Sequence, residues 1–171
     1  MGAFLQDLVA DNGAGLAVVG GMLAVMLGGW GSARGLRISG AQSAGVLTEK
    51  PELYGKCLVL TVLPATQGLY GLVGMIMIAV QTGLMAGEPF VTPGQGMAVL
   101  LVGAALGVVL YFSAVFQGET CAACINLTSK RPDEMGRSLV FPILVEFYAL
   151  LALLAEIILI IFYIKPPVAA G

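Results

Sequence analysis

One carboxylate lies deep within a strongly apolar part of the sequence. Glu146 stands within residues 138–155, which contain no other charged side chain. A charged side chain at the centre of a membrane-spanning helix costs about 2.5 to 3.5 kcal/mol to insert, and such residues mark ion pathways and proton relays. Glu146 is therefore the first candidate functional residue.

Neutral oxygen atoms occur at a comparable place in an earlier apolar stretch. Thr66, Gln67 and Tyr70 stand at positions i, i+1 and i+4, so they lie on one broad side of a helix. Pro64, just before them, lacks a backbone N–H group and clashes with the preceding turn. We expect the helix to be loosened there, with nearby carbonyl groups free to face a ligand.

Gln117, in a third apolar stretch, completes a set of oxygen donors. A carboxylate, two amide oxygens, a hydroxyl and a phenol, with no sulfur or imidazole at the same depth, are typical of a site for a hard cation. The alternative is a network of Gln, Thr and Tyr hydrogen bonds that only holds the helices together. Such a network gives no reason for Glu146, so we expect an ion site.

The composition defines the elements that must position these residues. The chain has 171 residues, of which 58% are hydrophobic and 11% charged, and its mean hydropathy is +0.97. Soluble domains average roughly 25% charged residues, so a water-soluble globular protein is excluded. Four mostly apolar stretches are each long enough to cross the ~30 Å hydrocarbon core of a bilayer. The sequence thus predicts an all-α membrane protein with four transmembrane helices, at residues 12–33, 57–86, 97–118 and 138–164.

Several classes of function are excluded by what the sequence lacks. There is no His, which excludes imidazole metal ligands, Ser-His triads and histidine proton relays. The segments outside the apolar stretches are too short for a nucleotide-binding or hydrolytic domain. No run of basic residues indicates a nucleic-acid partner. Any chemistry must take place inside the membrane or on partner subunits.

An internal repeat of about 80 residues divides the chain into two helical hairpins. The sequence LTEKP at residues 47–51 matches LTSKRP at residues 127–132, and Ser32-Ala33 matches Ser113-Ala114. With a small shift, Gln67 is the counterpart of Glu146. We predict a first hairpin at residues 1–88 and a second, carrying the glutamate, at residues 89–171. Both hairpins run through the membrane in the same direction.

The basic residues predict the orientation of the chain. Seven of the eight lie in or beside the connections within the two hairpins. By the positive-inside rule these connections are cytoplasmic, and the middle connection at residues 87–94 and both termini face the opposite side. We expect the membrane to be a bacterial plasma membrane.

Small residues recur at intervals of seven in the first and third helices. Small side chains let helix backbones approach closely in a membrane, so these two helices should lie together on a crowded side. The second and fourth helices carry larger side chains and should face lipid, which gives each chain the shape of a wedge from a ring. The small residues are Ala14, Gly21, Gly28 and Gly35 in the first helix and Gly96 and Gly103 in the third.

Three segments together resemble a known family. They are LPATQGLYG at residues 63–71, FQG at residues 116–118 and VEFYA at residues 145–149. The chain is similar over its full length to the membrane rotor subunit, or proteolipid, of V-type rotary ATPases. The likeness is to the duplicated four-helix form with one carboxylate per two hairpins, of the sodium-translocating type called subunit K or c-type.

The resemblance implies a role for each candidate residue. Glu146 would carry the ion, and Tyr70 would support the glutamate by a hydrogen bond. The Na⁺ ligands implied by the family's motif are the Leu63 carbonyl, Thr66, Gln67, Gln117 and Glu146.

The resemblance also implies partners. The chain would form a homo-oligomeric ring in lipid, which turns against a stator membrane subunit with half-channels. A central rotor stalk would dock at the cytoplasmic hairpin connections. ATP hydrolysis would lie on other subunits, so the chain would not be an enzyme by itself. Two alternatives stay open: H⁺ instead of Na⁺ as the coupling ion, and a small cation transporter that works alone.

Glu156 does not fit the motif. It is a second acid in the fourth apolar stretch, ten residues after Glu146 and about 80° away from it around a helix. Three explanations stay open at this point. Glu156 lies near the outer membrane surface, pairs with a neighbouring helix, or is protonated.

Overall fold

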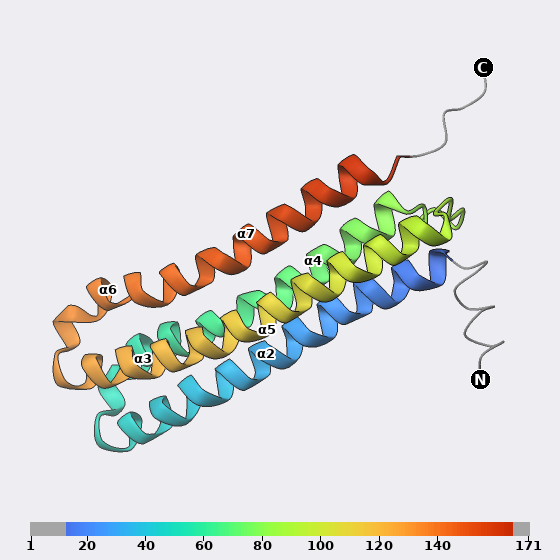
Figure 1. The fold of residues 1–171 in the computed structure, drawn as a ribbon. Helices are drawn as coiled ribbons and strands as arrows, with labels where there is room; N and C mark the ends of the chain where they lie inside the picture. The colour runs from blue at the N-terminus through green and yellow to red at the C-terminus, as the bar shows by residue number, and fades with distance from the viewer. Residues whose placement is uncertain (1–12, 166–171) are drawn as a thin grey trace.

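The fold consists of four long helical spans joined by short connections (Figure 1). The computed structural model describes residues 13–165 and contains no strand within that range. All four spans are long and apolar enough to cross a membrane, which confirms the all-α membrane fold.

The first span is α2 (Gly13–Glu49) and the third is α5 (Pro93–Lys130). The second consists of a 3₁₀ turn (Pro51–Leu53), α3 (Tyr54–Val62), a 3₁₀ turn (Leu63–Ala65) and α4 (Thr66–Gln81), and the fourth of a 3₁₀ turn (Pro132–Glu134), α6 (Met135–Ser138) and α7 (Val140–Tyr163).

The helices extend beyond the apolar stretches that the sequence predicted. At 37 and 38 residues, α2 and α5 exceed the roughly 20 residues that a bilayer requires. The predicted connections within the hairpins are therefore mostly helical, and the basic residues Arg34 and Arg37 lie on α2. The two long helices end at Glu49 and Lys130, because the next residue in each case precedes a proline and is pushed out of the helical conformation.

The two hairpin turns have nearly the same backbone conformation. Lys50 adopts φ −135° and ψ 68°, and Arg131 adopts φ −137° and ψ 81°. Each is followed by a proline in the first turn of a 3₁₀ helix. Lys56 Nζ donates to the Pro132 carbonyl at 2.6 Å, which ties the two turns together. The repeat in the sequence is thus also a repeat of backbone geometry.

Close packing of α2 against α5 forms one layer of the molecule. A Cβ atom added at Gly20 would lie 2.8 Å from the Val99 carbonyl oxygen, and one at Gly118 would lie 2.5 Å from Gly35 Cα. Only glycine permits backbones to approach so closely. The crowded side predicted for the first and third helices is confirmed.

The small residues of α2 pack against two neighbouring helices, α4 and α5, rather than one. A Cβ at Gly28 would meet the Gln67 carbonyl oxygen of α4 at 2.9 Å, and Gly21 packs against Met75 of α4. Gly35 contacts both Ala114 of α5 and Pro64. The seven-residue stripe predicted from the sequence therefore faces α4 as well as α5.

The middle connection joins α4 to α5 at the opposite end of the bundle from the hairpin turns (Figure 1). Gly83 and Gly87 have φ values of 76° and 78°, which L-residues with side chains rarely adopt. Thr92 caps α5, because its hydroxyl accepts a hydrogen bond from Gln95 N at 3.3 Å. The first and last described residues lie at this same end, whereas the predicted positions of the two termini fall on residues 1–12 and 166–171, outside the described range.

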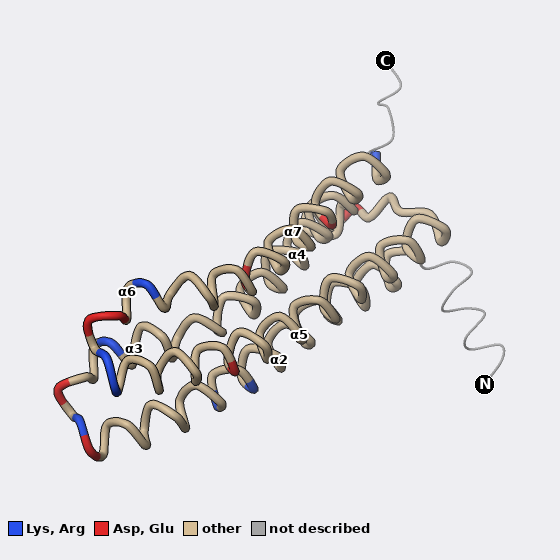
Figure 2. The backbone as a smooth tube through the Cα atoms, turned by 60° about the vertical axis from the view of Figure 1, so that its left-hand side comes forward, with Lys and Arg blue, Asp and Glu red and all other residues tan. Residues whose placement is uncertain are grey.

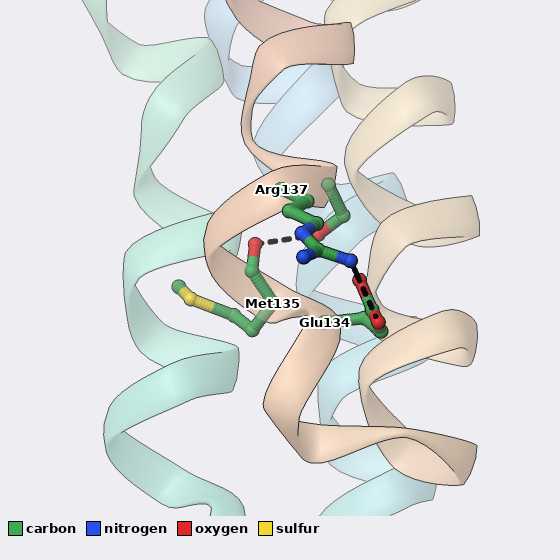
Figure 3. Close-up of polar contacts among 4 residues, drawn as sticks. Glu134, Met135 and Arg137 are labelled. Carbon is green, nitrogen blue, oxygen red and sulfur yellow. Dashed lines mark hydrogen bonds and ion pairs between the residues drawn. The ribbon is translucent and has the colours of Figure 1, made fainter.

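Charged residues gather at the hairpin-turn end, and the long middle parts of the helices are almost free of them (Figure 2). One ion pair at that end joins Arg137 to Glu134 at 3.2 Å (Figure 3). The Arg137 side chain is 86% exposed, so this pair contributes at most about 1 kcal/mol to stability. The polar contacts that matter for function lie deeper, between the helices.

Candidate ion-binding site

A break in the second helical span opens the site. Pro64 interrupts the helix, so α3 ends at Val62 and α4 begins at Thr66, with a 3₁₀ turn between them. Pro64 is buried against Gly35 of α2. The Leu63 carbonyl accepts a hydrogen bond from Thr66 Oγ1 at 3.0 Å. The structure confirms the loosened helix predicted from Pro64 and places one carbonyl beside the candidate side chains.

Glu146, on α7, is held by donors from two other helices. Tyr70 of α4 donates its hydroxyl proton to Glu146 Oε1 at 2.6 Å. Gln117 of α5 donates from Nε2 to Glu146 Oε2 at 3.4 Å. Each oxygen of the Glu146 carboxyl group therefore has a hydrogen-bond partner on another helix.

Gln117 connects the carboxylate to the amide of the first hairpin. Its Oε1 accepts a hydrogen bond from Gln67 Nε2 at 2.7 Å, and its Nε2 donates to the Pro142 carbonyl at 3.0 Å. Both Gln67 and Gln117 are completely buried. Buried amides are costly unless they are hydrogen-bonded, so each side chain fixes the position of the other.

Thr66 extends the network to the broken helix. Thr66 Oγ1 lies 3.3 Å from Gln67 Oε1 and 3.0 Å from the Leu63 carbonyl. The network thus runs from Leu63 through Thr66 and Gln67 to Gln117, and from there to Glu146 and Tyr70. All six residues that the sequence analysis selected are brought together, from three of the four helical spans.

The site also contains two serines, which the sequence analysis did not select. Ser113 Oγ lies 3.4 Å from Gln67 Nε2 and donates to the Val145 carbonyl at 3.3 Å. Ser32 Oγ accepts from the Gly68 backbone N–H at 2.8 Å. The signal that pointed to them was the match of Ser32 with Ser113 in the repeat. Both place a hydroxyl where two helices meet around the candidate ligands.

The charge of the site suits a monovalent cation. Within residues 13–165 there is no cluster of three or more His, Cys, Asp or Glu side chains that would hold a metal. Glu146 is the only acid in the network, and the other oxygens are neutral. A single carboxylate compensates a single positive charge, whereas a divalent ion would leave a net charge inside the membrane.

The fold and this site define a class of membrane rotor subunit. The family of ATP synthase C subunits matches the chain at residues 13–78 and 100–159, one stretch in each hairpin. The chain belongs to this family. It is a c-type proteolipid, an ion-translocating rotor subunit of a V- or A-type ATPase, which forms an oligomeric ring with other ATPase subunits and is not itself catalytic.

Two relatives are similar in sequence to most of this chain. The sequence is 32% identical over 164 residues to the V-type sodium ATPase subunit K of Enterococcus hirae, covering 92% of this chain and 98% of that protein. It is 34% identical over 146 residues to the A-type ATP synthase subunit K of Methanocaldococcus jannaschii, covering 85% of this chain and 62% of that protein. The chain therefore matches the first relative over nearly its whole length.

Proposed function

We propose that the ring carries Na⁺ across the membrane at Glu146. The observation that carries this proposal is the continuous network from the Leu63 carbonyl to the Glu146 carboxylate, in which one acid is surrounded by neutral oxygens. The similarity to a subunit named for a sodium ATPase supports the same ion. The proposed ligands are the Leu63 carbonyl, Thr66, Gln67, Gln117 and Glu146, with Tyr70 as the hydrogen-bond donor that orients the glutamate.

The number of oxygens at the site favours a metal cation over a proton. A proton on Glu146 needs at most one acceptor, and the Tyr70 hydroxyl can fill that role because it both donates and accepts. A metal cation needs several oxygen ligands, and Thr66, Gln67 and Gln117 lie close enough to supply them. A proton site also has no need of the further oxygens of Thr66 and Gln67.

Loading the ion requires a small change at Gln117 and Gln67. Its Nε2 atom faces Glu146 and its Oε1 atom faces Gln67. A rotation of the amide by about 180° around its last bond exchanges the two atoms with little change in shape. The oxygen then faces the carboxylate, beside a cation, and the hydrogen bond to the Pro142 carbonyl is given up. The Gln67 amide must rotate as well, because its Nε2 atom faces Gln117 and its Oε1 atom faces Thr66. We propose that these rotations accompany Na⁺ binding.

Neutralisation of Glu146 explains how the ring turns. Glu146 is partly exposed on α7, so it meets lipid when its chain is away from the stator. The empty carboxylate resists this environment because burial of the charge is costly, and bound Na⁺ removes the net charge. A positively charged stator residue near the half-channels would stabilise the empty form and so promote release.

The orientation and stalk contacts follow from the charge distribution. Lys50, Lys56 and Arg131 lie at or next to the hairpin turns, where charges gather (Figure 2). The positive-inside rule supports a cytoplasmic position for this end, in a bacterial plasma membrane. We propose that the central stalk docks there.

Separate family matches in the two halves support the division into hairpins at residues 1–88 and 89–171.

Carbodiimide labelling of the purified ring tests the choice of ion. A hydrophobic carbodiimide reacts with Glu146 when the carboxyl takes up a proton, and bound Na⁺ excludes that proton. We expect Na⁺ to protect Glu146, with half-protection at lower concentrations as the pH rises. Labelling that is indifferent to Na⁺ at every pH would replace Na⁺ with H⁺ as the coupling ion. Glu88→Gln is a matched control, because Glu88 is an exposed acid in the middle connection.

A further inference from the structure

A second acid is buried in α7 without a hydrogen-bond partner. Glu156 is 2% exposed, and neither of its carboxylate oxygens has a hydrogen-bond partner anywhere in residues 13–165. It follows Glu146 by ten residues, about 15 Å along the helix, toward the end that carries the middle connection. Glu156 is therefore separate from the ion-binding network. Pairing with a neighbouring helix, one of the explanations left open above, does not occur within the described chain.

The helix opposite leaves space for this carboxyl group. A Cβ atom at Gly74 of α4 would overlap Glu156 Oε2 and would lie 2.6 Å from Leu106 Cδ2. Any other residue at position 74 would displace the acid. Because Gly74 has no side chain, α4 at this position forms one wall of a pocket that fits the carboxyl group.

The other wall is an apolar groove between α5 and α7. The groove has a volume of about 300 Å³ and is lined, apart from Glu156, only by aliphatic side chains, among them Leu101, Ala105, Leu106, Ala152 and Leu159. It is open to the surface of the single chain. A cation in this groove would find no oxygen ligand other than the acid itself.

No positive charge faces Glu156 from any of the helices around it. Neither α4 nor residues 93–118 of α5 contain a charged residue; their titratable groups are Tyr70 and Tyr111. Tyr70 donates to Glu146, and Tyr111 accepts a hydrogen bond from Arg34. On α7 itself the titratable groups are Glu146, Tyr148 and Tyr163, and Lys165 lies nine residues beyond Glu156. An ionised Glu156 would thus be buried without a partner in the described chain, which strongly disfavours the charged form.

We propose that Glu156 is a second acid site of the rotor ring, which holds a proton and does not bind Na⁺. The ring then carries two acids per chain with different ligands: a cation among oxygens at Glu146 and a proton in an apolar pocket at Glu156. The proton neutralises Glu156 throughout rotation. This inference does not depend on the identity of the ion at Glu146.

Infrared spectroscopy of the assembled ring tests the protonation state directly. A protonated carboxyl has a C=O stretching band that an ionised carboxylate lacks. Glu146→Gln removes the ion-site acid, and Glu156 is then the only buried acid among the described residues. We expect the E146Q ring to retain one protonated carboxyl band at neutral pH, with and without Na⁺. The band should be absent from the E146Q/E156Q ring and shifted in the E146Q/E156D ring.

Two results would overturn the proposal. Absence of the band from the E146Q ring at neutral pH would show that Glu156 is ionised, and this measurement requires no substitution at position 156. Loss of the band on addition of Na⁺ would show that Glu156 is a second cation site. Carbodiimide labelling of the same rings adds an independent readout: we expect an adduct at Glu156 whose yield is the same with and without Na⁺, while the adduct at Glu146 in the unmodified ring is suppressed by Na⁺.

Discussion

Two glutamates on one helix have opposite surroundings. Glu146 accepts hydrogen bonds from Tyr70 and Gln117 and belongs to a network that reaches the broken helix of the first hairpin. Glu156 has no hydrogen-bond partner in the described chain and lies against Gly74 and aliphatic side chains. We propose that the same side chain binds a cation at one level of α7 and holds a proton at another. On this proposal, the residues around each acid determine which of the two it binds.

The two hairpins differ in a complementary way. Their turns have nearly the same backbone conformation, but the first hairpin carries the proposed neutral ligands beside a helix broken at Pro64, and the second carries the acid on a continuous α7. A carboxylate in place of Gln67 would double the charge of the proposed site. On this proposal, the duplication produces one ion site from two halves rather than two equal sites. The substitutions below test this comparison, from the largest expected effect to the smallest.

Removing the acid of the ion site should have the largest effect. Glu146→Gln keeps the shape of the side chain but removes the charge that the cation neutralises. We expect loss of Na⁺ transport by the assembled complex, measured as ATP-driven Na⁺ uptake into vesicles, with rings still assembled. Glu88→Gln should transport normally. Normal transport by the E146Q complex would end the assignment of the site.

Breaking the link between the hairpins should have the next largest effect. Gln117→Leu removes the direct bridge between Gln67 and Glu146 and leaves the buried Gln67 amide without its 2.7 Å partner. A lost buried hydrogen bond costs about 1 to 3 kcal/mol, so we expect Na⁺ affinity of the ring to fall by roughly ten- to a hundredfold.

Gln81→Leu, at the end of α4 away from the site, is the control for this measurement. Its Na⁺ affinity should equal that of the unmodified ring. Equal affinities for Q117L and Q81L would show that Gln117 only holds the helices together, which is the hydrogen-bond-network alternative raised by the sequence.

Removing the tyrosine hydroxyl should have a smaller effect. Tyr70→Phe deletes the 2.6 Å hydrogen bond to Glu146 Oε1 but leaves every proposed ligand in place. We expect Na⁺ affinity to fall by about tenfold and carbodiimide labelling of Glu146 to extend to higher pH, because the anion loses a donor. Tyr148→Phe is the matched control, since Tyr148 lies on α7 with 68% of its surface exposed. An unchanged Y70F ring would remove Tyr70 from the site.

Changing the second acid should leave Na⁺ binding almost untouched. Glu156→Gln replaces a neutral acid with a neutral amide about 15 Å along α7 from the ion site, and distant sites are usually independent within about 0.5 kcal/mol. We expect the Na⁺ affinity of the E156Q ring to stay within roughly twofold of the unmodified ring. A tenfold loss would show that the two acids are coupled.

The exposed ion pair at the second hairpin turn should matter least. Arg137→Ala removes the contact with Glu134 shown in Figure 3, which lies at the hairpin-turn end of the bundle. We expect a change in unfolding free energy below about 1 kcal/mol and no change in Na⁺ affinity. A larger loss of stability would show that the turn depends on this pair.

Much of the site could be predicted because its residues are costly in a membrane. An acid, two amides and a threonine have few reasons to occur at membrane depth, so their presence alone indicated Glu146, Gln67, Gln117 and Thr66. Tyr70 could be added to this set because helical spacing aligns it with Thr66. Ser32 and Ser113 were not selected, since a serine satisfies its hydroxyl on its own helix at little cost and gives no strong signal.

The lengths of the helices and the surroundings of Glu156 could not be predicted. Hydropathy marks only the part of a helix that lies in lipid, so it missed the continuation of α2 to Glu49 and of α5 to Lys130. The pocket at Glu156 depends on Gly74, which lies in a different helix and looks in the sequence like any other small packing residue. Its role becomes visible only when α4 and α7 are placed side by side.

Sodium binding by purified rings tests the central claim most directly. Rings equilibrated with radioactive Na⁺ should retain one ion per chain, and retention should disappear in the E146Q ring and persist in the E156Q ring. Retention of Na⁺ by the E146Q ring, or its loss in the E156Q ring alone, would contradict the assignment of the cation to Glu146 and its neutral oxygen ligands.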